Sequence, residues 1–415
     1  MKDVDILSAP LGTDVVSPDT DIPKGAVRSA INLAIHTSGN YDRRDGATKV
    51  LTLAAPRSLW HNRGKTLTLV VVGDTLYALR GTGAAMTATS VASGFWPGPV
   101  RFAEIGDRVY AMGGRFACLD ANLNVTQPGV ASMLGSEPVL DTAIGALTAG
   151  TYGVAIAAVS ARGEESGLSG CAWIDLASDS GIKVTLPGII GDAARYRIYR
   201  TTGNGDELYL ADEVAASTSV TYLASGDVGR KETTWMRDVL PAGDEIAVWR
   251  GRLLSALGSF LFYSDPYNVG LYDPRTNFVA LEGDCGHMVL PVDEGIYVGT
   301  EDRVYFLRGN SPKDLTIEVV AGNGVIRHSG LLVDGALTDG DPSSGDKPVA
   351  VWLSPHGYQI GRPNGIVESP QSRRIILEGS GRAPTAAFTR KGVPQLISAT
   401  ETLTLGNSGT ADVTP

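Results

Sequence analysis

The sequence has little charge and no long apolar run, and both shortages exclude whole classes of protein. Charged residues make up 19% of the 415 residues and hydrophobic residues 43%, a composition that excludes a disordered chain and a coiled coil. No stretch reaches 18 consecutive apolar residues, so we expect no membrane span and no membrane partner. The opening MKDVDILSAPLGTD has early acidic residues and no long apolar core, which does not fit a secretory signal.

Cysteine is scarce and the usual catalytic motifs are missing. Cys118, Cys171 and Cys285 lie far apart with no C-x-x-C pair, which predicts three reduced, buried thiols rather than a disulfide framework or a zinc site. The five histidines form no H-x-x-x-H pair, and the chain has no G-x-S-x-G elbow and no phosphate-binding P-loop. We therefore expect no cofactor, no metal and no enzymatic activity.

Positive charge is in deficit, with 35 Lys and Arg against 45 Asp and Glu and a net charge of −10. Tight DNA binding depends on basic residues that neutralise phosphates, so this balance disfavours a protein that wraps nucleic acid. It leaves open a surface past which DNA slides without specific binding.

Helical periodicity is nearly absent, whereas turns and alternating strands are frequent. Glycine accounts for 51 residues and proline for 22, and glycine at about 12% is well above the roughly 7% of average chains. One phrase recurs, an apolar strand followed by an acidic turn and a strand with a tyrosine. It appears as LVVVGDTLYALRG (69–81), RFAEIGDRVYAMGG (101–114), IYVGTEDRVYFLRG (296–309), and more loosely at 350–362 and 247–266.

Recurring hairpins of this kind predict an all-β fold built around a β-propeller, whose small sheets bury their faces only against neighbouring sheets. The spacing is irregular, because Tyr77 and Tyr110 are 33 residues apart and Tyr305 and Tyr358 are 53 apart. A β-sandwich or a mixed β fold with unrelated hairpins remains the alternative. If the ring closes through the chain ends, 396–397 or 403–405 should pair with the strand expected at 49–53.

Residues 136–238 differ from the rest in their short strands and regularly spaced turns. We expect strands near 152–156, 182–186, 195–200, 208–210 and 220–222, with Asn204-Gly205 as a strong hairpin turn signal. About seven strands in this length indicate an immunoglobulin/fibronectin III-like β-sandwich. The phrases GEES, YRIYRT and TSVTY resemble fibronectin type III-like modules, especially those of phage virion proteins. The expected domains are 1–135 and 239–415 for the two parts of the propeller, and 136–238 for the inserted sandwich.

Several clusters could carry chemistry, and each has a plainer explanation. Glu282 and Asp284 lie near Cys285 and His287, but nothing in the sequence gives the separation of carboxylates that glycoside hydrolysis needs. The acidic segment 339–346 lacks the spacing of a calcium loop, so a solvated loop is favoured. The tryptophans are spread one to a segment, which favours packing over sugar binding; they are Trp60, Trp96, Trp173, Trp235, Trp249 and Trp352.

Two arginine pairs are the candidate contact residues. Arg43 and Arg44 stand in a turn of mixed charge, and Arg373 and Arg374 stand just before an apolar strand. Either pair could contact a neighbouring subunit or a phosphate of DNA in a channel. We favour a solvated or intersubunit role over DNA.

Longer phrases of the sequence resemble the β-propeller tail or head-closure proteins of tailed bacteriophages, which act as a nozzle or stopper. The resemblance rests on AVRSAINL (26–33), YDRRDG (41–46), SLW (58–60), VWRGRLL (248–254), FYSDP (262–266) and the segment 289–309. It covers most of the chain through loose motifs. The chain is shorter than many nozzle proteins, so its exact position in a tail is left open.

The resemblance implies a structural virion protein, assembled in the host cytoplasm, that acts in DNA ejection at the tail or head–tail connector. It implies a homo-oligomeric ring, a hexamer, around genomic DNA, with the portal or adaptor and other tail proteins as partners. Acidic charge facing the channel would keep DNA from adhering. The alternative is a carbohydrate- or receptor-binding propeller of a tail tip, and the third candidate is a glycan-acting enzyme.

Overall fold

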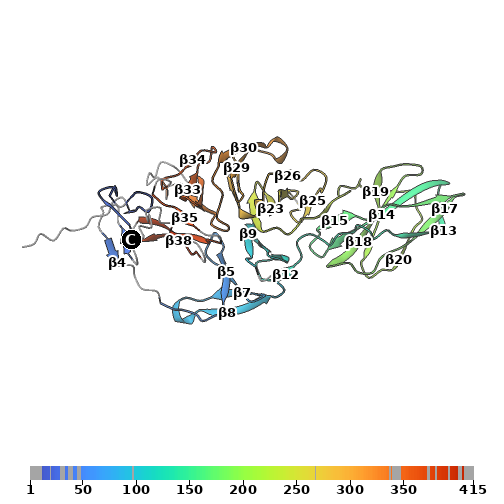
Figure 1. Ribbon diagram of the computed structural model, residues 1–415. Coiled ribbons are helices and arrows are strands. Elements are labelled where there is room, and N and C mark those ends of the chain that lie inside the picture. Colours follow the sequence, from blue (N-terminus) through green and yellow to red (C-terminus); the bar gives the residue numbers. More distant parts are fainter. Residues whose placement is uncertain are drawn as a thin grey trace, which may run out of the picture. The chain divides into compact units, whose positions relative to one another are not determined.

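The structure is a computed structural model whose elements are strands and three short 3₁₀ helices in the part of the chain that it describes (Figure 1). The described residues are 12–18, 20–28, 33–35, 41–43, 48–95, 98–266, 268–335, 338, 347–371, 374–378, 381–390, 393–400 and 404–405. The chain divides into two compact units. One comprises Met1–Thr52, Thr82–Met86 and Leu281–Pro415, and the other comprises Leu53–Gly81 and Thr87–Ala280. The predicted all-β class is confirmed.

The second unit contains three four-stranded antiparallel sheets. The first sheet is β5 (Pro56–His61), β6 (Thr68–Val72), β7 (Thr75–Arg80) and β8 (Thr87–Ala92). The second is β9 (Arg101–Ile105), β10 (Arg108–Met112), β11 (Phe116–Leu119) and β12 (Val125–Thr126). The third is β22 (Glu245–Trp249), β23 (Arg252–Leu257), β24 (Phe260–Tyr263) and β26 (Phe278–Ala280), and the pair β21 (Asp238–Val239) and β25 (Leu271–Tyr272) lies outside these sheets.

These three sheets are stacked, because the middle one buries both of its faces. In β10, Val109 and Ala111 join a hydrophobic core shared with β6 and β7 of the first sheet. Tyr110 and Met112, on the opposite face, join a core shared with β22 and β23 of the third sheet. Successive strand residues point to opposite faces, so an unbroken apolar run such as Val109–Met112 suits a sheet enclosed between two others.

The first unit repeats this arrangement. Its sheets are β27 (Met288–Val292), β28 (Gly295–Gly299), β29 (Val304–Arg308) and β30 (Thr316–Ala321), then β31 (Leu331–Asp334), β32 (Pro348–Ser354), β33 (Gly357–Gly361) and β34 (Val367–Glu368). In β32, Ala350 and Trp352 pack with the β27–β30 sheet. Val349 and Val351 face the other way, into a core that Leu396 of β37 (Val393–Ser398) also contacts. The β31–β34 sheet of this unit therefore also buries both faces.

The remaining elements are short. The two-stranded pairs are β1 (Gly12–Thr13) with β2 (Ala26–Val27), β3 (Leu33–Ile35) with β4 (Tyr41–Arg43), β35 (Leu377–Glu378) with β38 (Thr404–Leu405), and β36 (Thr385–Arg390) with β37. The 3₁₀ helices are η1 (Gly83–Ala85), η2 (Cys285–His287) and η3 (Pro312–Asp314). No helix among the described residues is long and apolar enough to cross a membrane.

The recurring phrase forms hairpins at all five predicted places, but it occupies different strands of the sheets. In the first sheet it makes the second and third strands, β6 and β7, and in the second sheet it makes the first and second, β9 and β10. Tyr77 therefore lies in the third strand of its sheet and Tyr110 in the second strand of the next, so their spacing of 33 residues is shorter than one full repeat. Tyr305 and Tyr358 both lie in third strands, β29 and β33, so their longer spacing compares equivalent positions.

Glycine rather than aspartate sets the conformation of two of these turns. Val72 is opposite Thr75, which leaves Gly73 and Asp74 as a two-residue loop, and Gly73 has φ +62°. The same holds for Gly106, whose φ is also +62°. Positive φ at the first loop residue suits a type II′ turn, for which glycine is preferred. The copy at 296–309 differs, because four residues separate the paired Gly299 and Val304.

Residues 139–223 form two sheets that pack around one core. The three-stranded sheet has the order β13 (Val139–Leu147), β17 (Ser180–Thr185) and β20 (Val220–Leu223). In the five-stranded sheet, β14 (Gly150–Ser160) pairs with β15 (Glu165–Leu168), β16 (Ala172–Leu176) and β18 (Ala193–Thr201), and β18 pairs with β19 (Leu208–Ala215). Ile156, Ile182 and Tyr196 are fully buried between the sheets. We call this pair of sheets the sandwich.

The hairpin expected at Asn204-Gly205 forms, because β18 pairs with β19, but Thr201 pairs with Leu208 and leaves a six-residue loop. Within this loop the N–H of Gly205 donates to the carbonyl of Thr202 at 2.9 Å, and Asn204 has φ +58°. Asn204 also bonds to Thr151, through its backbone N–H (2.8 Å) and through its side-chain oxygen (3.0 Å). The expected pairing of the chain ends was wrong, because 49–53 is not a strand, β37 pairs with β36, and β38 pairs with β35.

Candidate functional site

The four predicted contact arginines are only partly described. Arg43 is exposed at the end of β4, and Arg374 is half-buried. The carbonyl of Arg374 accepts a 2.8 Å hydrogen bond from the backbone N–H of Val15, which joins two distant segments of the first unit. Arg44 and Arg373, like the acidic loop 339–346, lie outside the described residues. The proposed subunit or DNA contacts of these arginines stay predictions.

The structure brings Asp284 and His287 together through Arg327. The guanidinium donates to the carboxylate of Asp284 and, through Nε, to Nε2 of His287 at 3.1 Å. Nδ1 of His287 lies 2.7 Å from the carbonyl oxygen of Val325 and must donate to it. Both ring nitrogens are thus engaged in holding the loop, and Glu282 instead forms an ion pair with Arg303 at 2.8 Å. The hydrogen bonds of this cluster hold the segments around residues 284–287 and 325–327 together.

Two of the three thiols and two of the five described tryptophans are buried as predicted. Cys118 and Cys285 are buried free thiols and Cys171 is a half-buried one, and burial raises the pKa of Cys285 to about 12. Trp249 and Trp352 are core residues, as predicted. Trp96 lies outside the described residues. No group of three His, Cys, Asp or Glu side chains that could hold a metal occurs among the residues the structure describes.

Two neighbouring glutamates at the start of β15 join the sandwich to the stacked sheets. Glu164 accepts from Arg108 of β10 and from Arg162, each at 2.7 Å. Arg162 in turn donates to Thr126 of β12. The turn between β14 and β15 is therefore bonded to two strands of the second sheet.

Glu165, beside it, is the most buried acidic group of the sandwich, at 8% exposure. Its carboxylate accepts from Arg197 at 2.6 Å, from Arg230 at 2.7 Å and from the hydroxyl of Tyr199. Burial and this hydrogen bond raise the pKa of Tyr199. A buried carboxylate is stable only when its oxygens are paired in this way, so Glu165 fixes the strands around it.

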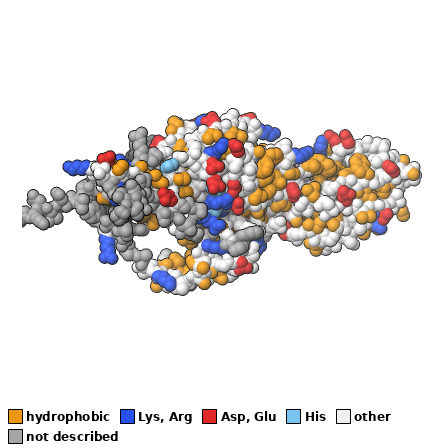
Figure 2. Space-filling model, in the orientation of Figure 1, with side chains coloured by type: hydrophobic (Ala, Val, Ile, Leu, Met, Phe, Trp, Pro, Cys, Tyr) orange, Lys and Arg blue, Asp and Glu red, His pale blue; other side chains and the backbone are white. Residues whose placement is uncertain are grey.

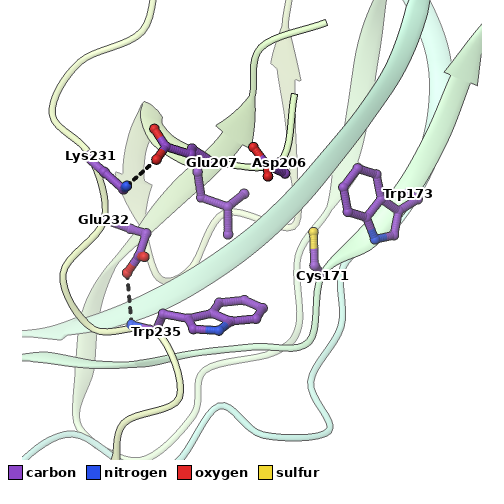
Figure 3. Close-up of a pocket in the computed structure, with 8 residues that line it drawn as sticks. Cys171, Trp173, Asp206, Glu207, Lys231, Glu232 and Trp235 are labelled. Carbon is purple, nitrogen blue, oxygen red and sulfur yellow. Dashed lines mark hydrogen bonds and ion pairs between the residues drawn. The ribbon is translucent and has the colours of Figure 1, made fainter. Parts of the chain in front are cut away.

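The sandwich also carries a cavity of about 240 Å³ (Figure 3). Its walls come from β16 and β19 and from the segments 206–207 and 231–235. The lining side chains are Cys171, Trp173, Asp206, Glu207, Leu208, Lys231, Glu232 and Trp235. Trp173 is 55% exposed and Trp235 is 39% exposed. The expectation that the tryptophans do not cluster and serve packing is wrong for these two.

Trp173 could have been assigned from the sequence, whereas Trp235 could not. In β16 the side chains of Trp173 and Asp175 share one face, and the polar Asp175 indicates that this face is exposed. Trp235 follows β20 in a segment without strand alternation, and its position depends on a tertiary contact. Its backbone N–H donates to the carboxylate of Glu232 at 2.9 Å.

The charged groups of the cavity are unevenly paired (Figure 3). Lys231 forms a 2.6 Å ion pair with Glu207, which also accepts from the hydroxyl of Tyr209 at 2.6 Å. These two hydrogen bonds, that of Lys231 first, lower the pKa of Glu207. Among the described residues no hydrogen bond or ion pair reaches the carboxylate of Asp206. In the cavity, Glu207 is thus paired with Lys231, Glu232 interacts with Lys231 through its charge without an ion-pair contact, and Asp206 has neither a hydrogen bond nor an ion pair among the described residues.

No family model and no curated protein matches this chain. Among solved structures, it is similar to apo AztD from Citrobacter koseri, at 12% identity over 80% of this chain and 87% of that one, with a TM-score of 0.29. It is also similar to YCF48 bound to D1 peptide, at 11% identity over 89% and 96% with a TM-score of 0.31. A third is the N-terminal domain of Nup159, at 13% identity over 86% of this chain and 90% of that one, with a TM-score of 0.25. These neighbours are β-propellers, but TM-scores this low carry no argument for this chain.

Proposed function

We propose that the chain is a β-propeller interrupted by a fibronectin type III-like module, and that it serves as a structural virion protein of a bacteriophage tail or head–tail junction. The observation that supports this most is the stacking of four-stranded antiparallel sheets that bury both faces. Blades of a propeller are sheets of this kind, since each is covered by a neighbour on either side. The assignment to a phage tail rests on the sequence motifs that resemble those of phage nozzle or stopper proteins.

The bonding of the sandwich suits a mechanical role. Glu164 and Arg162 tie it to β10 and β12, and the carbonyl of Glu165 accepts from Asn268 at 3.0 Å. At Gly167, an added Cβ would lie 1.8 Å from the carbonyl oxygen of Arg237, so the two backbones are in direct contact. A module held by ion pairs and close backbone packing resists local opening better than one on a free linker.

His287 and Cys285, which the sequence placed among the candidates for catalysis, have structural roles. His287 uses both ring nitrogens in hydrogen bonds, and burial keeps the thiol of Cys285 protonated. A general base or a nucleophile needs a free lone pair or a lowered pKa. This supports a protein that acts by assembly.

The proposed ring is tested by native mass spectrometry of the purified chain, alone and with a phage portal protein. We expect an assembly of six chains, or one that forms when the portal is added. DNA retention on the assembly should be negligible, because a net charge of −10 does not neutralise phosphates. A chain that stays monomeric with and without the portal would contradict the proposal.

A carbohydrate- or receptor-binding role is the second candidate, and the cavity between Trp173 and Trp235 favours it. Exposed indole faces at a cavity are suited to stacking against a ligand. Turnover of a glycan, the third candidate, would be detected by release of reducing ends. Binding without turnover would favour the second candidate over the third.

A further inference from the structure

We propose that the cavity of the sandwich binds one cationic side chain, arginine or lysine, of a partner protein. The first argument is size. Its volume of about 240 Å³ lies below the roughly 300–1,000 Å³ typical of pockets for whole small-molecule ligands. A cavity of this size suits the end of one long side chain.

The second argument is the pair of indoles. Trp173 and Trp235 border the cavity from different segments, with Cys171 between them (Figure 3). Large aromatic side chains are usually buried, and Trp352 of this chain is fully enclosed. Trp173 instead leaves 55% of its surface exposed. The face of an indole attracts a cation, and tryptophan is the best of the aromatic residues at this.

The lining of the cavity also carries an excess of negative charge. Its one cation, Lys231, already forms an ion pair with Glu207 at 2.6 Å. Asp206 has no hydrogen bond or ion pair among the residues the structure describes. Glu232 accepts one hydrogen bond, from the N–H of Trp235, and makes no ion-pair contact, although the charge of Lys231 also acts on it. A guanidinium or ammonium group placed between them would gain both ionic hydrogen bonds and contact with an indole.

The same arrangement suits a neutral sugar less well. A sugar would stack on an indole and donate hydroxyls to the carboxylates, but it would leave their two charges uncompensated. A cation neutralises them. The inference goes beyond the proposed function, because the cavity can be tested on the isolated chain whether or not the chain assembles into a ring.

The probe is N-acetyl-L-arginine amide, and its matched control is the citrulline derivative, which has the same shape and no charge. Binding is followed by NMR of the six indole N–H groups in protein labelled with ¹⁵N-tryptophan. Replacement by phenylalanine at 173 and at 235 assigns two of the signals. We expect the arginine probe to shift these two signals and the citrulline probe to bind at least about fivefold more weakly.

The variant that tests the charge is Asp206→Asn, and Asp107→Asn in the β9–β10 turn is its control. Both remove one exposed carboxylate, but only Asp206 lines the cavity. We expect Asp206→Asn to weaken arginine binding by about two- to fivefold, in line with the strength of exposed ion pairs, and Asp107→Asn to leave it unchanged. Added salt should weaken binding by screening the charges.

Three results would overturn the inference. One is equal binding of the arginine and citrulline probes, and another is equal loss in the two asparagine variants. The third is that methyl glycosides shift the Trp173 and Trp235 signals while the arginine probe does not, which would assign the cavity to sugars. A variant that fails to fold is recognised because its four other indole signals also move.

Discussion

The sandwich and the stacked sheets of the second unit bury their strands differently. In the stack, four consecutive residues of β10, Val109–Met112, are buried, because each face meets another sheet. In the sandwich, the nine consecutive residues Tyr152–Ser160 of β14 are also buried, but the side chains that cover them come mainly from strands of the sandwich itself. Its edge strand β13 is more open, and Ile144 there is 97% exposed. Hydrophobic side chains accordingly appear on the surface of the sandwich in Figure 2. A stacked sheet depends on its neighbours for burial, whereas the sandwich encloses its own core.

The largest expected difference between the two regions is in their ability to fold alone. We predict that residues 136–238 expressed alone fold cooperatively, because all the buried residues of their core except Val130 and Met133 lie within the fragment, between its own two sheets. Residues 98–127, which contain the second sheet, should stay unfolded alone, since both faces lose their cover. Circular dichroism and urea unfolding of the two fragments check this. Cooperative unfolding of the fragment 98–127 would show that the stack is not needed.

Glu165 should matter to the sandwich itself. Glu165→Gln removes the charge that Arg197, Arg230 and Tyr199 contact. We expect about 1–2 kcal/mol lower stability from the weakened buried hydrogen bonds, because Arg197 keeps its 2.7 Å ion pair with Glu213 and Arg230 is half exposed. Urea unfolding of the isolated 136–238 fragment measures the loss.

Glu164→Gln is the matched control, because its partner Arg108 lies outside that fragment and its other partner, Arg162, is a near neighbour in the same turn. It should change the stability of the isolated fragment by less than about 0.5 kcal/mol and destabilise the full chain by less than about 1 kcal/mol. Equal losses from the two variants in the fragment would contradict the separation between a group that stabilises the sandwich and one that attaches it.

The turns of the stack should respond to backbone conformation. Gly73→Ala is expected to cost about 1–2 kcal/mol, because φ +62° is unfavourable for any residue with a Cβ. Gly64→Ala in the same sheet should cost little, since its backbone is not in that region and the nearest atoms to an added Cβ lie at 3.8 Å or more. Thermal unfolding of the full chain compares the two. A smaller loss at Gly73 than at Gly64 would contradict the type II′ assignment.

The smallest predicted effect concerns pH. The hydrogen bond from Arg275, opposed by burial, lowers the pKa of Asp273 to about 2. Because the folded pKa lies below the unfolded value, ionised Asp273 stabilises the chain above about pH 4, and that contribution is lost as the pH falls towards 2. Asp273→Asn should flatten the stability curve in this window by less than about 1 kcal/mol, since Arg275 is 55% exposed. An unchanged curve would show that the pair contributes nothing.

The fold could be predicted from the sequence where local patterns determine it. Turn residues between apolar strands, including Gly73 and Gly106, predicted all five hairpins, because turn conformation and alternation are properties of a few neighbouring residues. The closure of the chain ends could not be predicted, since β35 with β38 and β36 with β37 are chosen by tertiary contacts. Asn204 shows both sides of this limit: its turn forms as the local signal predicts, whereas its bonds to Thr151 and the six-residue loop could not be predicted from neighbouring residues.

The candidate site was the less predictable part. Its residues come from four segments between Cys171 and Trp235, and no spacing in the sequence brings them together. Only the alternation of β16, which places Trp173 beside Asp175 on an exposed face, gave a local signal. The arginines singled out by their pairing, Arg43 and Arg374, belong to other segments and do not line the cavity.

Electron cryo-microscopy of the chain mixed with a phage portal protein tests the central proposal most directly. The account predicts a ring of subunits around an open channel, in which each subunit arranges its four-stranded sheets in a closed circle with 136–238 projecting as a separate sandwich. A subunit whose sheets remain in open, unconnected stacks, or a chain that joins no ring, would contradict it.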